Sequence, residues 1–297
     1  MTAASSRRAA LPELAKYLVL GIFVIAFLFP IFALIAASFR PGRDLMRYGI
    51  SFGTLLPDRL DPKNFAELAT SRDGVYLAWF KNSAILTALQ AGLALVLSSF
   101  VGYGLGVYRF RGRNLVFILV LAVMLVPLQI LILPLYKLMS AIGIMNSYAG
   151  VVAPFIVSPF AIFFFRQYSL GIPKDYLDAG RIDGLGEFRI FFLLTAPLMA
   201  PAFGAMAILM SQQAWNSFLW PLIVMRTGNM FPLTIGLNSL LTPYGNNYDM
   251  LIAGSCAASV PIIIVFFFFQ RFFISGLSAG NHPSRCRTGG KPGYSGP

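Results

Sequence analysis

The residues of this chain that could do chemistry fall into two groups, a charged segment and a short polar run. The charged segment, residues 172–197, reads IPKDYLDAGRIDGLGEFRIFFLLTAP and holds seven charged side chains: Lys174, Asp175, Asp178, Arg181, Asp183, Glu187 and Arg189. The polar run comprises Ser211, Gln212, Gln213, Asn216 and Ser217. Charged side chains of both signs form ion pairs with a protein surface, whereas amides hydrogen-bond to the hydroxyl groups of a polar solute. Both groups therefore indicate binding.

Other kinds of chemistry lack the residues they need. All eleven acidic residues lie outside the apolar segments, which argues against a proton relay within a bilayer, although backbone carbonyls can hold Na⁺. His282 is the only histidine, and Cys256 and Cys286 are the only cysteines, so we expect no metal site, no histidine-based catalysis and no disulfide framework. The sequence also lacks a Gly-x-x-x-x-Gly-Lys-[Ser/Thr] phosphate loop, so any ATP hydrolysis on that pattern belongs to another polypeptide.

Composition predicts an all-α integral membrane protein. Hydrophobic residues make up 57% of the chain and charged residues 11%, against about 25% charged in soluble domains. A helix needs about 20 apolar residues to cross a bilayer. Charge-free runs predict six transmembrane helices at about 17–39, 84–108, 115–136, 147–165, 197–219 and 250–273. Residues 227–248 are also free of charge, but their Gly, Pro and Asn content predicts a loop.

The distribution of Lys and Arg predicts the orientation of these helices. Basic residues concentrate in the N-terminal segment 1–16, in the second and fourth connections and in the tail, whereas the third and fifth connections carry only Lys137 and Arg226. Both termini and residues 172–197 are therefore expected in the cytoplasm. The first connection, residues 40–81, runs against this trend with seven basic and five acidic residues. The net charge of +12 follows from this topology, so we expect no nucleic-acid partner.

Two further patterns have alternative interpretations. The glycines from Gly102 to Gly106 resemble a nucleotide-binding turn, but within a lipid span the Gly102-x-x-x-Gly106 spacing favours the close approach of two helices. The polar run either forms interhelical hydrogen bonds or lines a solute pathway through Gln212, Gln213 and Asn216. The sequence leaves both interpretations of the polar run open.

Within residues 172–197 the sequence predicts a short helix followed by a turn. Pro173 suits the first helical position, where its missing N–H costs nothing. Gly184 stands where the helix should end. Asp178 and Arg181 have the i,i+3 spacing of a helical ion pair, so we expect them on one charged edge.

Around this helix the chain resembles the EAA loop of ABC-importer permease subunits, whose pattern is E-A-A-x-x-x-G-x(9)-I-x-L-P. Asp178, Ala179 and Gly180 stand at E-A-A, Gly184 at the glycine, and Leu194, Ala196 and Pro197 at I-x-L-P. The small pair Ala179 and Gly180 predicts a shallow face against which another protein packs. Residues 215–222 (WNSFLWPL) and 270–280 (QRFFISGLSAG) also resemble the carbohydrate branch of this family, and most closely the maltose-type second permease subunit.

The resemblance implies the ABC type I importer permease fold over residues 17–280, in the bacterial cytoplasmic (inner) membrane. It implies a coupling helix at about 173–183 that is seated in a cytoplasmic ATPase. The implied coupling residues are Asp178, Ala179, Gly180, Arg181, Asp183, Gly184 and Pro197. ATP and Mg²⁺ would be bound by two ATP-binding cassette subunits, so no cofactor is expected on this chain. A homologous second permease subunit would complete a heterodimer, and an extracytoplasmic solute-binding protein would deliver a sugar to residues 40–81 and 226–249.

The expected function is therefore import of a sugar or oligosaccharide by a transporter subunit that is not itself an enzyme. Three alternatives remain: a permease for a polyol, glycerol phosphate or an acidic oligosaccharide, a secondary carrier or channel acting alone, and an intramembrane enzyme. The last lacks the histidine and acid that such a site requires in the membrane. Residues 281–297 fall outside the resemblance, and their Gly, Pro and Ser content predicts disorder.

Overall fold

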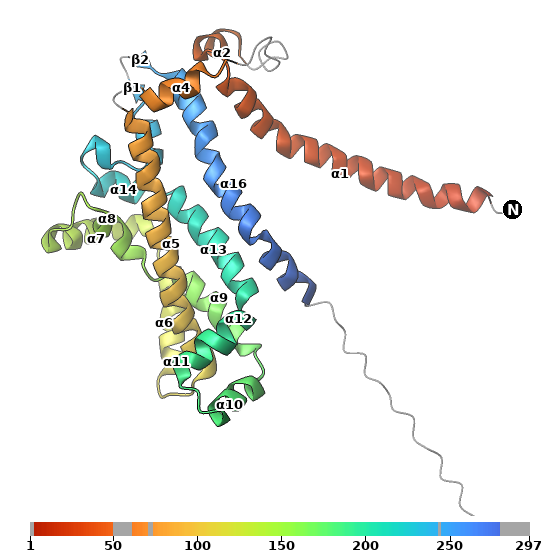
Figure 1. Ribbon diagram of the computed structural model, residues 1–297, viewed down its shortest axis with the longest axis vertical. Helices are drawn as coiled ribbons and strands as arrows, with labels where there is room; N and C mark the ends of the chain where they lie inside the picture. Colours follow the sequence, from red (N-terminus) through yellow and green to blue (C-terminus); the bar gives the residue numbers. More distant parts are fainter. Residues whose placement is uncertain (1–2, 50–60, 71–73, 243–244, 280–297) are drawn as a thin grey trace, which may run out of the picture. The chain divides into compact units, whose positions relative to one another are not determined.

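The computed structural model describes residues 3–49, 61–70, 74–242 and 245–279. Regular structure in these ranges is helical apart from two two-residue strands, β1 (Leu241–Thr242) and β2 (Gly245–Asn246), which pair antiparallel. Figure 1 shows the order of the helices along the chain. The prediction of an all-α fold is confirmed, whereas the tail at 281–297 lies outside the described residues.

Long apolar helices dominate the part of the chain that the structure describes. Three are each long and apolar enough to cross a membrane: α1 (Ala3–Ser38), α5 (Val75–Val107) and α16 (Tyr248–Ala279). Three helix pairs meet the same criterion only together: α6 (Arg113–Met124) with α7 (Leu128–Ile142), α8 and η2 (Tyr148–Phe155) with α9 (Pro159–Leu170), and Glu187–Leu198 with Ala200–Val224. Up to six spans result if each bent pair counts as one. The count of six and the cytoplasmic termini remain predictions.

Proline residues account for where these pairs are broken. Pro127 precedes α7 with an extended backbone, Pro159 lies in the first turn of α9, and Pro201 lies at the start of α13 (Ala200–Trp215). Proline lacks an N–H donor and disfavours the helical conformation in the residue before it. The charge-free runs at 115–136 and 147–165 are therefore interrupted, which a test based on charge alone does not reveal.

Contacts divide the chain into two compact units. Unit 1 comprises residues 1–93, 126–156 and 211–264, and unit 2 comprises residues 94–125, 157–210 and 265–297. Unit 1 also contains the short helices α2 (Gly42–Tyr48), α4 (Lys63–Thr70), α14 (Leu219–Val224) and α15 (Leu233–Asn238). Each unit has buried apolar clusters of its own, one around Trp79 and Trp215 in unit 1 and one around Tyr103 and Ile190 in unit 2.

In unit 1 the segment 227–248 is tied to the beginning of α5. The indole N–H of Trp79 donates to the carbonyl of Gly228 at 2.7 Å, and the amide of Asn82 donates to the carbonyl of Asn229 at 2.7 Å. No span found among the described residues covers this segment. Among its described residues the segment forms no membrane-length helix before Tyr248, as predicted, and the hydrogen bonds hold Gly228 and Asn229 against α5.

In unit 2, α5 and α9 pack closely at two glycines. A Cβ atom on Gly102 would lie 2.7 Å from Cβ of Phe165, and one on Gly106 would lie 2.9 Å from Cβ of Ser169. A Cβ atom on Gly104 would meet nothing within 4 Å. The predicted close helix approach at Gly102 and Gly106 is confirmed, because any larger side chain there would push the two backbones apart.

Candidate coupling loop and polar groove

The charged segment forms the short helix that its sequence predicts, α10 (Lys174–Ile182). Pro173, predicted as the first helical residue, is instead the N-cap with an extended backbone (φ −60°, ψ 135°), and the helix begins one position later at Lys174. At the other end Gly184 adopts φ +74°, a left-handed conformation that strains residues with a Cβ atom. The predicted helix and its glycine stop are confirmed, whereas their role in coupling is a separate question.

After Gly184 the chain returns through α11 (Glu187–Ile190), a π-helical turn η3 (Phe191–Thr195) and α12 (Ala196–Leu198), which contains Pro197. Leu177 of α10 and Ile190 of α11 are buried in one cluster with Tyr103 of α5. Figure 1 shows α10 and α11 beside the last part of α5, which belongs to the same unit. The loop is therefore anchored by its own hydrophobic core.

Gly180 corrects one expectation from the sequence. It is buried, and a Cβ atom there would lie 2.8 Å from Cδ1 of Leu194 and 3.2 Å from Cγ1 of Ile190. The prediction that Gly180 offers a shallow face to another protein is wrong, because that face packs on its own chain. Leu177 and Gly180, three residues apart, form the inward stripe of α10, while Ala179 is exposed. Glycine replaces the usual alanine of the motif where Leu194 and Ile190 leave little room.

An ion-pair network fixes the outer edge of the loop. Arg181 donates through Nε to Oε1 of Glu187 and through Nη1 to Oδ1 of Asp178, both at 2.8 Å. The hydroxyl of Tyr108, at the end of α5, donates to Oε2 of Glu187 at 2.6 Å. The hydrogen bond to Glu187, and then that to Asp178, raises the pKa of Arg181 above its ordinary value. The predicted ion pair of Asp178 and Arg181 is confirmed, and Asp183 is the C-cap residue of α10.

Two exposed apolar side chains complete this surface, and the sequence analysis missed both. Ile182 is 86% exposed and Phe188 is 75% exposed. Apolar side chains that stand out among charges are typical of a protein contact. The exposure of Ile182 could have been predicted from helical spacing, because this apolar residue of α10 lies off the buried stripe of Leu177 and Gly180. No local pattern predicts the exposure of Phe188, since that exposure depends on how α11 is oriented.

The second candidate site lies on α13 and just after it. Gln212, Gln213 and Asn216 are all exposed. Among the described residues, their side chains make no hydrogen bond with another residue. Interhelical hydrogen bonding inside this chain therefore does not explain the polar run, and the solute-pathway interpretation stays a prediction.

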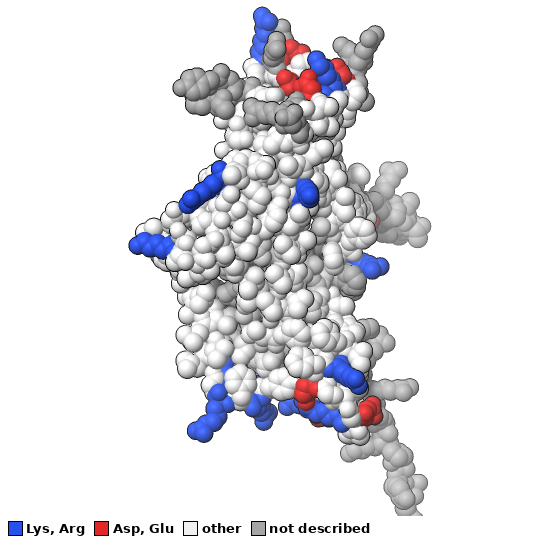
Figure 2. Space-filling model, turned by 60° about the vertical axis from the view of Figure 1, so that its left-hand side comes forward, with Lys and Arg blue, Asp and Glu red and all other residues white. Residues whose placement is uncertain are grey.

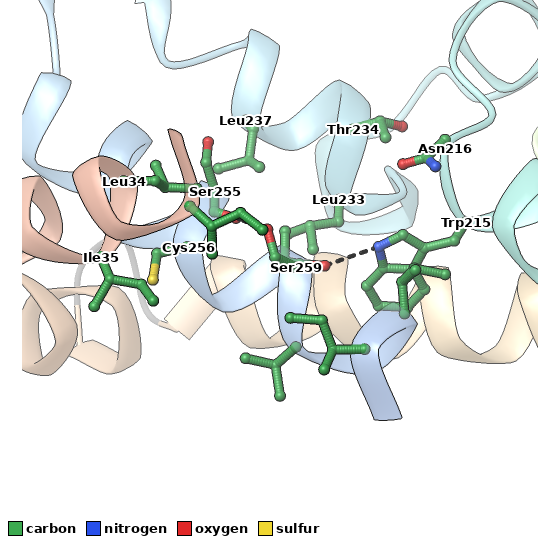
Figure 3. Close-up of a pocket in the computed structure, with 15 residues that line it drawn as sticks. Leu34, Ile35, Trp215, Asn216, Leu233, Thr234, Leu237, Ser255, Cys256 and Ser259 are labelled. Carbon is green, nitrogen blue, oxygen red and sulfur yellow. Dashed lines mark hydrogen bonds between the residues drawn. The ribbon is translucent and has the colours of Figure 1, made fainter. Parts of the chain in front are cut away.

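A groove of about 520 Å³ in unit 1 lies next to this run. Figure 3 shows Asn216 and Thr234 at one side of it and Ser255, Cys256 and Ser259 of α16 lining another. The groove is mainly apolar, and Gln212 and Gln213 do not line it. Of the three predicted pathway residues, Asn216 alone lines this groove. Within the described ranges, no group of three or more His, Cys, Asp or Glu side chains is placed to hold a metal ion.

Long apolar helices with an ordered charged loop indicate an integral membrane protein, and comparison with known proteins identifies its kind. The sequence pattern of the family described as "Binding-protein-dependent transport system inner membrane component" matches residues 94–278. The arabinooligosaccharides transport system permease protein AraQ of Bacillus subtilis (strain 168) is 53% identical over 259 residues, which are 86% of this chain and 90% of that protein. The chain therefore belongs to the family of inner membrane components of binding-protein-dependent transport systems.

Two further comparisons agree with this assignment. The lactose transport system permease protein LacG of Rhizobium radiobacter is 32% identical over 270 residues, covering 91% of this chain and 96% of that protein. A crystal structure of a bacterial ABC transporter involved in the import of the acidic polysaccharide alginate contains a chain that matches with a TM-score of 0.77 and 21% identity, covering 90% of this chain and 98% of that chain. The fold is that of an importer permease. The predictions of an inner-membrane transporter subunit that is not an enzyme are confirmed.

Proposed function

We propose that this chain is the membrane-spanning subunit of an ATP-driven importer that moves a sugar or oligosaccharide into the cytoplasm. The observation that carries the proposal is the 53% identity to the arabinooligosaccharide permease over 90% of that relative's length. Arabinooligosaccharides are therefore the first solutes to test. The lactose permease and the alginate importer also act on saccharides, and their similarity to this chain supports the broader solute class.

The loop at 172–197 is the proposed attachment point for the ATPase. Ile182 of α10 and Phe188 of α11 are exposed and suited to enter an apolar groove on that partner, and the charged edge of Asp178 and Arg181 lies on α10 with Ile182. Because the sequence has no phosphate loop, ATP and Mg²⁺ would be held by two ATP-binding cassette subunits. The buried Leu177 holds the helix to its own chain, so a push on α10 would move the end of α5 with it.

The other partners follow from the family and from exposed surfaces. A binding protein is part of the family's description, and it would deliver solute to the first and fifth connections. A homologous second permease subunit would cover apolar surface that is open in the single chain. In the membrane-length part of α1, Lys16–Ser38, only 6% of the apolar 18-residue window is buried. Gln212, Gln213 and Asn216 would then face either that subunit or the solute.

The test is reconstitution of the chain with its second permease, ATPase and binding protein in proteoliposomes. Uptake of labelled arabinotriose is expected to require both ATP and the binding protein, and the trisaccharide is expected to stimulate ATP hydrolysis. Proteoliposomes without the binding protein serve as the control. Solute flux through the lone chain in the absence of ATP would contradict the proposal. Stimulation by glycerol 3-phosphate with none by any saccharide would contradict the solute class.

A further inference from the structure

The turn between α5 and α6 carries a positive cluster without a neutralising acid among the described residues. Arg109, Arg111 and Arg113 lie in this turn, and Arg166 on α9 lies against it: its Cζ stands 3.8 Å from the ring centre of Phe117, one helical turn after Arg113. All of these residues belong to unit 2. Figure 2 shows basic side chains gathered at the lower end of the view, where α6 and α10 lie in Figure 1.

Within the described ranges, none of these four arginines has a carboxylate at ion-pair distance. Glu187, which contacts Tyr108 nearby, is engaged by Arg181. The one hydrogen bond of the Arg113 side chain goes from Nη1 to the carbonyl of Tyr108 at 3.3 Å. Nε of Arg166 is buried and has no hydrogen-bond partner in the described part of the chain. Four arginines without a carboxylate partner among the described residues leave positive charge that favours an anion bound beside them.

The beginning of α6 adds further donors to the same place. A hollow of about 380 Å³ is lined by Arg109, Phe110, Gly112, Arg113, Asn114 and Leu115. No side chain caps this 12-residue helix, and its first turn contains no acid. The backbone N–H groups of Asn114 and Leu115 donate to no described residue. Helix N-termini attract anions through such free N–H groups, here beside two guanidinium groups.

The apolar part of the surroundings indicates the source of the anion. Phe110 and Leu115, both in the wall of the hollow, are 49% and 61% exposed. Ile118 and Leu119 continue this exposed stripe along α6, at 59% and 56%. The helix has no charged residue after Arg113, so the arginines stand where the apolar surface ends. A free phosphate would contact only the arginines, whereas a phospholipid would contact both the arginines and the exposed apolar stripe of α6.

We propose that the hollow at the start of α6 binds the headgroup phosphate of an anionic phospholipid, with its acyl chains along Leu115 and Leu119. Arg109 and Arg113 contact the phosphate, and Arg166 adds its positive charge from α9. Phosphatidylcholine binds less well because its choline is repelled by the arginines. The site concerns lipid binding alone and does not depend on the transported solute.

The test is native mass spectrometry of the purified full-length chain, alone or with its partner subunits, titrated with phosphatidylglycerol or phosphatidylcholine. The chain is expected to prefer phosphatidylglycerol, and Arg113→Gln or Arg166→Gln is expected to lower that affinity about fivefold each. Binding of phosphatidylcholine should hardly change. The matched control, Arg226→Gln with Lys137→Gln, removes two positive charges from other connections and should keep the preference.

The proposal would be overturned by equal binding of the two lipids or by unchanged phosphatidylglycerol affinity in both arginine variants. Displacement of the lipid by millimolar inorganic phosphate would also overturn it, because that would indicate a free-anion site. Gel filtration checks that the variants fold. Arg109→Gln provides a second route, because this side chain is exposed and makes no hydrogen bond with a described residue. It should also weaken phosphatidylglycerol binding about fivefold, and the proposal fails if it does not.

Discussion

The loop at 172–197 and the polar run on α13 are both polar segments of an apolar chain, but they are organised differently. In the loop, Arg181 bonds to Asp178 and Glu187, and Leu177 and Ile190 pack into a core of their own. In the polar run, the amides of Gln212, Gln213 and Asn216 are exposed and bond to no described residue. The side chains of the loop find their partners within the single chain, whereas the amides of the polar run find none among the described residues.

This difference indicates two ways of meeting a partner. A surface that is rigid before binding loses little conformational entropy on binding, which suits a loop that must transmit movement. Exposed amides gain partners only when another subunit or a solute supplies them. The loop should therefore respond to changes in its internal contacts, and the polar run to changes in what it meets.

The largest expected effect concerns the core of the loop. Ile190→Ala removes a fully buried side chain and should destabilise the loop by about 2–5 kcal/mol. Proteolysis of the loop in the purified chain measures this, and ATPase binding should be lost with it. Ile182→Ala is the control, because that side chain is 86% exposed. It should leave the loop resistant to protease while weakening ATPase binding. If both variants behave alike, the loop is not ordered independently of its partner.

The next effect concerns the end of α10. Gly184→Val places a β-branched residue at φ +74°, which costs about 1–2 kcal/mol. We expect weaker stimulation of the ATPase by the assembled transporter and faster loop proteolysis. Gly186→Val is the matched control, because Gly186 has φ −70° and free space around its Cα. Equal loss in both variants would show that the left-handed turn is not what orders the loop.

How much the sequence predicts differs between these two regions. Local rules were enough for α10, because a proline that precedes a helix and a glycine that ends it act within a few residues. They were not enough for Gly180, since the sequence of a nine-residue helix does not say which face packs on its own chain. The bond between Tyr108 and Glu187 joins residues 79 positions apart, and no local pattern indicates such a pair.

The same limit applies to the spans. Charge-free runs locate apolar segments because hydropathy is a sum over neighbours. They do not show the interruption before Pro127, which depends on backbone geometry. The polar run was recognised from its composition, but whether its amides face lipid, a partner or a solute depends on chains that its own sequence does not contain.

A smaller effect is expected in the polar run. Asn216→Leu removes an amide that lines the groove of unit 1, and the loss of one hydrogen bond to a solute hydroxyl corresponds to about 1 kcal/mol, or about fivefold in uptake. Assembly with the partner subunits should be unchanged, as measured by co-purification. Gln213→Leu is the comparison variant, since Gln213 is exposed outside the groove; an equal loss of uptake in both variants would show that the groove does not set the effect. Uptake that stays normal in Asn216→Leu would return this residue to a packing role.

The smallest expected effect concerns the ion-pair network. The side chains of Arg181, Glu187 and Asp178 are 41–59% exposed, and exposed ion pairs contribute at most about 1 kcal/mol. Glu187→Gln should therefore hardly change thermal stability, yet it should loosen α10 from the end of α5 by weakening the bonds to Arg181 and Tyr108. Asp175→Asn serves as the control. It also removes one negative charge, but from α10, where Asp175 has no ion pair among the described residues.

A double-mutant cycle of Glu187→Gln and Arg181→Gln, read by ATPase stimulation at low and high salt, isolates the pair from its surroundings. Coupling that falls as salt increases would show that the charges help to order the loop before the ATPase binds. Zero coupling at low salt would leave only Leu177 and Ile190 to order it. The loop would then differ from the polar run in its buried apolar contacts alone, because its charges would be as dependent on a partner as the exposed amides are.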